Sequence, residues 1–187
     1  MKVKIEDVEY SCVSVLDISL KDYNKILDIV NKYKDDVDIQ IETLSLLTDI
    51  PIDILDICDL VKIHKLYNKL TNINKEDIKL INEIKIGDVI YKTSEEFKSI
   101  DDIKLNRTQR RVIKEYADSS DYIASIVAVF FTINGDKIIN NDDDLKERIK
   151  LFKDNVKIGD VIPYIFNVIN TVAILTGEII NDLNDKL

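Results

Sequence analysis

Residues that commonly carry chemistry are scarce in this chain of 187 residues, which has no Trp, one His, two Cys, four Gly and two Pro. A zinc site needs three or four Cys and His at close spacing, and three such residues scattered along a chain do not form one. Gly87 and Gly159 are isolated, so the sequence contains no glycine-rich loop that would cradle a phosphate. We therefore expect no metal site, no cofactor and no enzymatic activity.

Two further candidate sites fail on spacing. His64 falls on a predicted amphipathic helix with no nucleophile near it in the sequence, which favours an ordinary helix residue over a general base. The acidic run 140–144 could be the start of a calcium-binding loop, which needs Gly at its sixth position and Glu at its twelfth. A loop that began at residue 140 has Leu145 and Leu151 there. The run more simply places negative charge at a helix N-terminus.

The charge balance of 26 Lys and Arg against 35 Asp and Glu gives a net charge of −9. A negative surplus repels phosphates, so we expect no sequence-specific nucleic acid among the partners. Cys12 and Cys58 lie far apart in the sequence, which indicates a reduced, cytosolic setting. The longest apolar run, Val161–Leu175, is interrupted by asparagines and is shorter than the ~20 residues that span a bilayer, so we expect no membrane role.

The spacing of apolar residues predicts a mainly α-helical α+β fold with a small N-terminal β element and a central β-hairpin. We expect one or two strands within residues 2–18 and a hairpin over 84–91 that turns at 87–88. Helices are expected over 20–33, 41–47, 60–70, 107–117, 120–132, 142–152 and 160–184, with another beginning at Pro51. We expect Ser19 and Asp59 to cap the helices 20–33 and 60–70, Leu60 to begin the apolar stripe of the latter, and Asn106 and Gln109 to form a capping box at the helix 107–117. We expect a single domain over 1–187 that divides, if it divides, into an N-terminal β/α element (1–38) and a helical body (39–187).

The hexamer Lys-Ile-Gly-Asp-Val-Ile occurs twice, at residues 85–90 and 157–162. The residues that flank the two copies do not match. Because a structural repeat extends over ~20 residues or more, we interpret the second copy as a coincidence of a biased composition.

A basic cluster on the predicted helix 107–117 comprises Arg107, Arg110, Arg111 and Lys114, whose spacing puts them on one face. One interpretation is a contact with phosphate or with an acidic protein. The other is a surface face that forms ion pairs with Glu95, Glu96 or Asp101. The three arginines are our first candidates for a salt bridge between subunits.

Two segments, Tyr122–Ile133 and Val161–Leu175, are apolar around most of the helix circumference. Such a helix is either central in its own domain or covered by another chain. Under the second alternative the candidate interface residues are Phe130, Phe131, Ile165, Ile169 and Val172.

The order of several motifs resembles a known family. The run Glu42–Pro51 precedes a predicted helix over 60–70, and the hairpin with Ile90 and Tyr91 precedes the run 103–109. An apolar helix that ends at residues 128–131, an acidic amphipathic helix with Leu145 and Arg148, and a last hydrophobic helix follow. Over about residues 40–175 this order resembles small structural and tail-assembly proteins of tailed bacteriophages that infect Bacteroidota, the crAss-like phages among them.

The resemblance implies a non-enzymatic structural protein of the phage virion, assembled in the cytoplasm of the host bacterium. In that role it would form a ring in the neck or tail and contact copies of itself and other neck, tail or portal proteins. The alternative is a soluble tail-assembly chaperone that is not retained in the virion. A third hypothesis, based on the net charge, is an acidic regulatory or inhibitor module that acts on a basic host protein.

Overall fold

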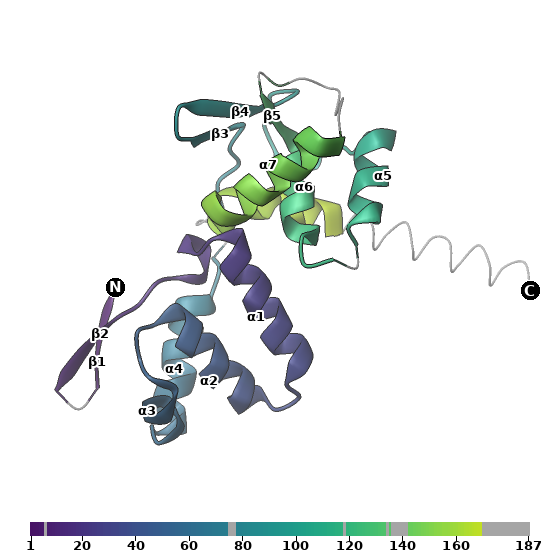
Figure 1. Ribbon diagram of the computed structural model, residues 1–187. Helices are drawn as coiled ribbons and strands as arrows, with labels where there is room; N and C mark the ends of the chain where they lie inside the picture. Colours follow the sequence, from purple (N-terminus) through teal and green to yellow (C-terminus); the bar gives the residue numbers. More distant parts are fainter. Residues whose placement is uncertain (6, 75–77, 118, 134, 136–141, 170–187) are drawn as a thin grey trace, which may run out of the picture. The chain divides into compact units, whose positions relative to one another are not determined.

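The computed structural model describes residues 1–5, 7–74, 78–117, 119–133, 135 and 142–169, and its fold is mainly helical α+β, as the sequence predicts (Figure 1). The chain forms two compact units. Unit 1 contains Met1–Ile78 and Asp154–Gly159, and unit 2 contains Lys79–Lys153 and Asp160–Leu187. The division expected at residue 38 falls inside unit 1, because residue 38 is part of a helix over 36–47 that packs against the helix before it.

Unit 1 begins with an antiparallel hairpin of β1 (Lys2–Ile5) and β2 (Val8–Ser11), in which Val3 faces Tyr10. A turn at Asp7, whose φ is +68°, joins the two strands. A short 3-10 helix, η1 (Val15–Asp17), follows.

Four helices complete this part of unit 1: α1 (Leu20–Lys32), α2 (Asp36–Leu47), α3 (Ile52–Asp56) and α4 (Leu60–Thr71). Helix α2 contacts each of the other three and carries the fully buried Leu44 and Leu47 into the core (Figure 1). The helix expected over 41–47 is longer than predicted. It begins at Asp36 because the Asp35 carboxylate accepts hydrogen bonds from the first backbone N–H groups of α2.

The predicted caps of α1 and α4 are confirmed. The Ser19 hydroxyl accepts the backbone N–H of Asp22 at 3.1 Å, and the Asp59 carboxylate accepts that of Val61 at 2.8 Å. Pro51, expected inside the first turn of a helix, is instead the N-cap of α3. Each cap satisfies or removes an N–H that would otherwise lack an intrahelical partner.

Residues 154–159 belong to unit 1 although the sequence places them after most of unit 2. The N–H of Leu20 donates to the carbonyl of Val156 at 3.0 Å, and the N–H of Ile158 donates to the carbonyl of Ile18 at 3.0 Å. A Cβ at position 159 would lie only 2.6 Å from the carbonyl oxygen of Leu16. This close approach of two backbone segments requires Gly159.

Unit 2 contains a three-stranded antiparallel sheet in the order β3 (Glu83–Ile86), β4 (Val89–Thr93), β5 (Phe131–Ile133). The predicted central hairpin is confirmed, with Gly87 at a φ of +58° in its turn. The third strand corrects the helix expected over 120–132. That helix ends at Phe130, and the bulky and β-branched residues after it pair with β4 because they suit a strand.

The helices of unit 2 are α5 (Arg107–Glu115), α6 (Tyr122–Phe130) and α7 (Asp142–Asn155), which starts in unit 2 and ends in unit 1, and residues 158–169 are also helical. A short 3-10 helix, η3 (Ile100–Asp102), precedes α5. The last helix begins at residue 158, two residues before the predicted start, and its predicted course beyond 169 lies outside the described residues. The predicted capping box of α5 is confirmed: the Asn106 side chain accepts the N–H of Gln109, and the Gln109 side chain accepts the N–H of Asn106, both at 2.9 Å.

Helix α6 is the centre of unit 2, with every residue from Ile123 to Phe130 buried. The Gln109 side-chain amide donates to the carbonyl of Val129 at 2.9 Å, and Nε of Arg148 donates to the carbonyl of Ala128 at 3.0 Å. Two carbonyls of the last helical turn thus obtain partners inside the core. Burial lowers the pKa of Arg148.

An aromatic cluster packs beside α6. The ring centroid of Tyr164 lies 4.9 Å from that of Phe131, 5.1 Å from that of Phe130 and 6.1 Å from that of Phe97. The Tyr164 hydroxyl donates to the carbonyl of Ile81 at 2.6 Å, and burial raises the pKa of this phenol. The Tyr164 side chain therefore packs its ring among other aromatic rings and has a hydrogen-bond acceptor for its hydroxyl.

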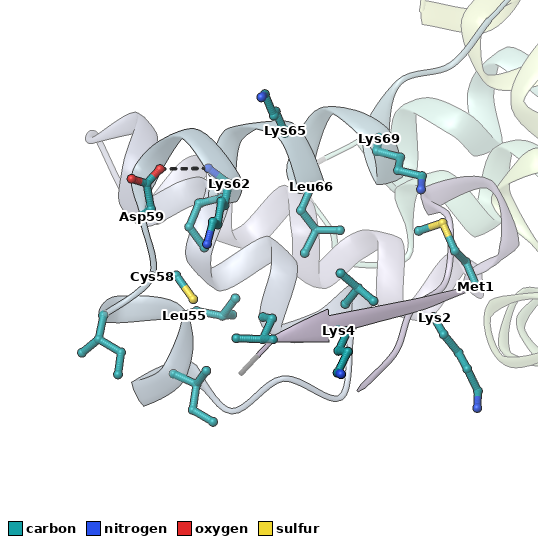
Figure 2. Close-up of a pocket in the computed structure, with 15 residues that line it drawn as sticks. Met1, Lys2, Lys4, Leu55, Cys58, Asp59, Lys62, Lys65, Leu66 and Lys69 are labelled. Carbon is teal, nitrogen blue, oxygen red and sulfur yellow. Dashed lines mark hydrogen bonds between the residues drawn. The ribbon is translucent and has the colours of Figure 1, made fainter. Parts of the chain in front are cut away.

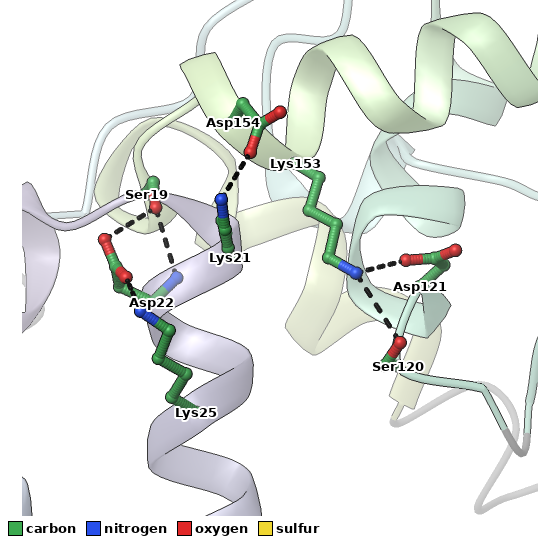
Figure 3. Close-up of polar contacts among 8 residues, drawn as sticks. All are labelled: Ser19, Lys21, Asp22, Lys25, Ser120, Asp121, Lys153 and Asp154. Carbon is green, nitrogen blue, oxygen red and sulfur yellow. Dashed lines mark hydrogen bonds and ion pairs between the residues drawn. The ribbon is translucent and has the colours of Figure 1, made fainter.

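The chain passes from unit 2 to unit 1 between Lys153 and Asp154, and each of these two residues forms an ion pair within its own unit (Figure 3). Lys153 lies 2.5 Å from the Asp121 carboxylate in unit 2, and the Asp154 carboxylate lies 3.3 Å from the Lys21 ammonium in unit 1. Asp22 pairs with Lys25 at 2.8 Å, and this hydrogen bond lowers the pKa of Asp22.

Candidate functional site

In the described part of the chain, His64 and the two cysteines do not form a cluster of reactive side chains. His64 is exposed on α4, with Nε2 2.9 Å from the Asn68 side-chain nitrogen. Cys12 is buried, which raises the pKa of its thiol, and Cys58 is half-buried. Within the described ranges no group of three His, Cys, Asp or Glu could hold a metal ion.

The predicted basic cluster lies on the exposed face of α5. Arg107, Arg110 and Arg111 are all exposed, and Arg111 lies 3.7 Å from the carboxylate of Glu115 within the same helix. The second interpretation of the basic cluster expects ion pairs with Glu95, Glu96 or Asp101. The ion pair of Arg111 is formed with Glu115 instead. An exposed pair one helical turn apart contributes only about 0.3 to 0.5 kcal/mol, so this face is available for other contacts.

Three of the predicted interface residues are inside the core of unit 2, which corrects the prediction. Phe130 and Phe131 pack in the aromatic cluster around Tyr164, and Ile165 is buried on the helix 158–169. Helix α6 is apolar on all sides because its own unit surrounds it, so the first alternative, central burial, holds for this segment.

The remaining predicted interface residues divide between surface and undescribed chain. Ile169 is exposed, as is Phe166 three residues before it, so the helix 158–169 presents two large apolar side chains to solvent. Val172 lies outside the described residues.

Apolar side chains that the sequence did not predict to be exposed form a surface where α3 meets α4. We call it the junction surface, and its members are Ile52, Ile57, Leu60 and Val61. The exposed fractions of Ile57, Leu60 and Val61 are 79%, 59% and 61%. Leu60 was predicted in the buried stripe of its helix, which is wrong, because that stripe begins at Ile63. The sequence signal for this surface is Val61, an apolar residue that lies outside the buried stripe of α4.

A groove of about 510 Å³ lies between β1 and the α3–α4 region (Figure 2). Its apolar lining includes the buried Leu55 and Ile63 and the half-buried Leu66. Five lysines also line it, against one carboxylate, that of Asp59; the lysines are Lys2, Lys4, Lys62, Lys65 and Lys69. We call this feature the lysine groove. It was missed because its two sides are about fifty residues or more apart in the sequence.

The chain has no match among protein-family models, curated proteins or solved structures. Across the described ranges, every helix is too short or too polar to traverse a lipid bilayer. What the geometry offers is therefore a set of surfaces: the junction surface, the lysine groove, the arginine face of α5, and the exposed pair Phe166 and Ile169.

Proposed function

We propose that this protein is a non-enzymatic structural component of a tailed-phage virion, a neck or tail ring protein that assembles by packing against copies of itself. The observation that carries the proposal is the junction surface. Fully burying a large aliphatic side chain stabilises a complex by about 1.5 to 3 kcal/mol, and three such side chains are more than half exposed here. Grouped apolar exposure of this kind marks surfaces that other proteins cover.

A ring requires each subunit to present two different surfaces, one to each neighbour. Unit 1 offers the junction surface, and unit 2 offers Phe166 and Ile169 on one helix and Val89, Ile90 and Ile133 on its sheet. Apolar exposure in both units supports a heterologous contact, in which one surface meets a different one on the next copy.

The net charge of −9 suits the lumen of such a ring. Carboxylates that line a passage repel the phosphates of DNA, so the DNA passes without binding to the wall.

Size-exclusion chromatography with light scattering at rising protein concentration tests the proposal. We expect the mass to rise from 21.6 kDa to a multiple of it. The double variant Ile57→Lys/Val61→Lys should remain monomeric, because it places two charges in the proposed contact. The control Val13→Lys/Val30→Lys changes two other exposed valines of unit 1 and should still assemble.

Detection of the chain in purified particles by mass spectrometry tests its place in the virion. A protein that stays monomeric at every concentration and is absent from particles would contradict the proposal.

The second candidate is a soluble tail-assembly chaperone, and the lysine groove favours it. A chaperone needs a concave surface that holds a segment of its client, and the groove combines an apolar lining with charge. In that case the chain would co-purify with a tape-measure or tail-tube protein from infected cells and give no signal in virions.

A further inference from the structure

We propose that the lysine groove binds an extended segment of a partner protein in which acidic and apolar residues alternate, and that this segment adds a third strand to the free edge of β1. The inference goes beyond the proposed function, because it names the chemistry of a partner and does not depend on ring formation.

The hydrogen bonding of the hairpin leaves one edge of β1 open. Met1 and Cys12 exchange two hydrogen bonds, of 2.8 Å and 2.7 Å. In an antiparallel pair such exchanging positions alternate with positions that do not exchange. With the observed register, Val3 exchanges with Tyr10, so the N–H and C=O groups of Lys2 and Lys4 point away from β2.

The two residues that carry these outward groups also line the groove. β1 is an end strand of a two-stranded sheet, and both Lys2 and Lys4 line the groove. An exposed strand edge pairs readily with an extended peptide, whose main chain supplies the complementary donors and acceptors.

The alternation of exposed and half-buried side chains along β1 determines which side chains the bound segment needs. Val3 and Ile5 are half-buried, whereas Lys2 and Lys4 are exposed on the opposite face of the strand. An added strand places every second side chain beside Val3 and Ile5, where apolar residues are favoured. The other side chains lie on the face of Lys2 and Lys4. Both lysines are more than half exposed and pair with Glu9 at 2.5 Å and Asp7 at 2.7 Å, so acidic residues there would share these cations and basic residues would be repelled.

The charges of α4 favour the same partner. Lys62 and Lys69 are exposed, and in Figure 2 their side chains extend at the Cys58 end and the Met1 end of the groove. The carboxylate of Asp59 already accepts backbone N–H groups of α4, at 2.8 Å and 3.3 Å. Because Lys2 and Lys4 already pair with the carboxylates of Glu9 and Asp7, the positive charge that the groove offers a partner comes from Lys62, Lys65 and Lys69 on α4, and an acidic segment complements it.

Fluorescence polarisation with the labelled peptide Glu-Ile-Glu-Val-Glu-Ile tests the proposal. We expect saturable binding that weakens as the salt concentration rises. The same peptide with N-methyl groups on alternate amides should not bind, because it lacks the donors for the β1 edge. A peptide with Lys in place of Glu should not bind either.

The double variant Lys62→Glu/Lys69→Glu should weaken binding of the acidic peptide by about tenfold. The control Lys34→Glu/Lys85→Glu makes the same change in net charge at exposed lysines that do not line the groove, and it should change binding less than about twofold. Far-UV circular dichroism checks that each variant is folded.

Three results would overturn the inference: no binding of the acidic peptide, equal binding of the N-methylated peptide, or equal effects of the two double variants. Displacement of the peptide by a single-stranded oligonucleotide would also overturn it, since it would indicate a phosphate site. Because Ile57 lines the groove and also belongs to the junction surface, binding is measured at protein concentrations at which the chain is monomeric, and the two proposals are then tested separately.

Discussion

The two copies of Lys-Ile-Gly-Asp-Val-Ile adopt different structures. Residues 85–90 form the end of β3, a two-residue turn and the start of β4. Residues 157–162 pass from a backbone bridge with unit 1 directly into a helix. Gly87 has a φ of +58° and no atom near its missing Cβ, whereas the missing Cβ of Gly159 would lie 2.6 Å from the carbonyl of Leu16.

The comparison shows which forces decide between strand and helix for one short sequence. Ile90 is 42% exposed on the central strand β4, and Ile162, at the same place in the hexamer, is 2% exposed in the core of unit 2. The intrinsic propensities of the six residues are identical in the two copies, so the difference comes from their surroundings, that is, from the flanking sequence and the tertiary contacts. The same glycine has two uses: one position needs a left-handed backbone, and the other needs the absence of a side chain.

The largest expected effect contrasts the two isoleucines. Ile162→Ala should lower the free energy of unfolding by about 2 to 5 kcal/mol, because it leaves a cavity in the core. Ile90→Ala should change it by less than about 0.5 kcal/mol, because an exposed side chain loses little. Urea denaturation followed by circular dichroism measures both, and equal effects would contradict the burial difference.

Gly159→Ala should lower the free energy of unfolding by about 1 to 3 kcal/mol, because its Cβ overlaps the Leu16 carbonyl and the two segments must separate. The higher helix propensity of alanine offsets about 1 kcal/mol of a larger cost. A stability equal to that of the unchanged protein would show that this close approach is absent in solution.

Gly87→Ala should cost about 1 kcal/mol, because its φ of +58° is unfavourable for a residue with a Cβ. Asparagine tolerates this conformation better, so Gly87→Asn should recover part of the loss. Gly159→Asn should recover nothing, since the difficulty at that position is space. Thermal unfolding of the four glycine variants tests this contrast, and recovery at both positions would contradict it.

The smallest effect is expected at the first residue of the hexamer. Lys157 pairs with Asp17 at 3.1 Å, and both side chains are more than half exposed. Lys157→Ala should therefore cost no more than about 0.5 kcal/mol. Lys85→Ala, at the corresponding exposed position, is the matched control, and a loss that persists in high salt would indicate a role other than the ion pair.

Local signals in the sequence predicted much of the fold. The caps at Ser19 and Asp59, the capping box at Asn106 and the turn at Gly87 each depend on residues within four positions of one another. Strand β5 could not be predicted in this way, because its three residues are strand only through pairing with β4, about forty residues earlier. The return of residues 154–159 to unit 1 is likewise a non-local contact.

The surfaces were harder to predict than the elements. The exposure of Arg107, Arg110 and Arg111 follows from their charge and was expected. Phe130 and Phe131 were candidates for an interface because hydrophobicity alone does not distinguish a helix inside its own unit from one covered by a partner. The lysine groove requires the positions of β1 and α4 in space, which no local pattern of the sequence contains.

The return of residues 154–159 has a consequence for synthesis on the ribosome. Residues 1–78 emerge first, but the backbone partners of Ile18 and Leu20 are in Ile158 and Val156, which emerge only after the sheet and helices α5 to α7. A nascent chain therefore carries an incomplete unit 1 through most of its translation, and the closing hydrogen bonds form only after nearly all the other described residues have been made.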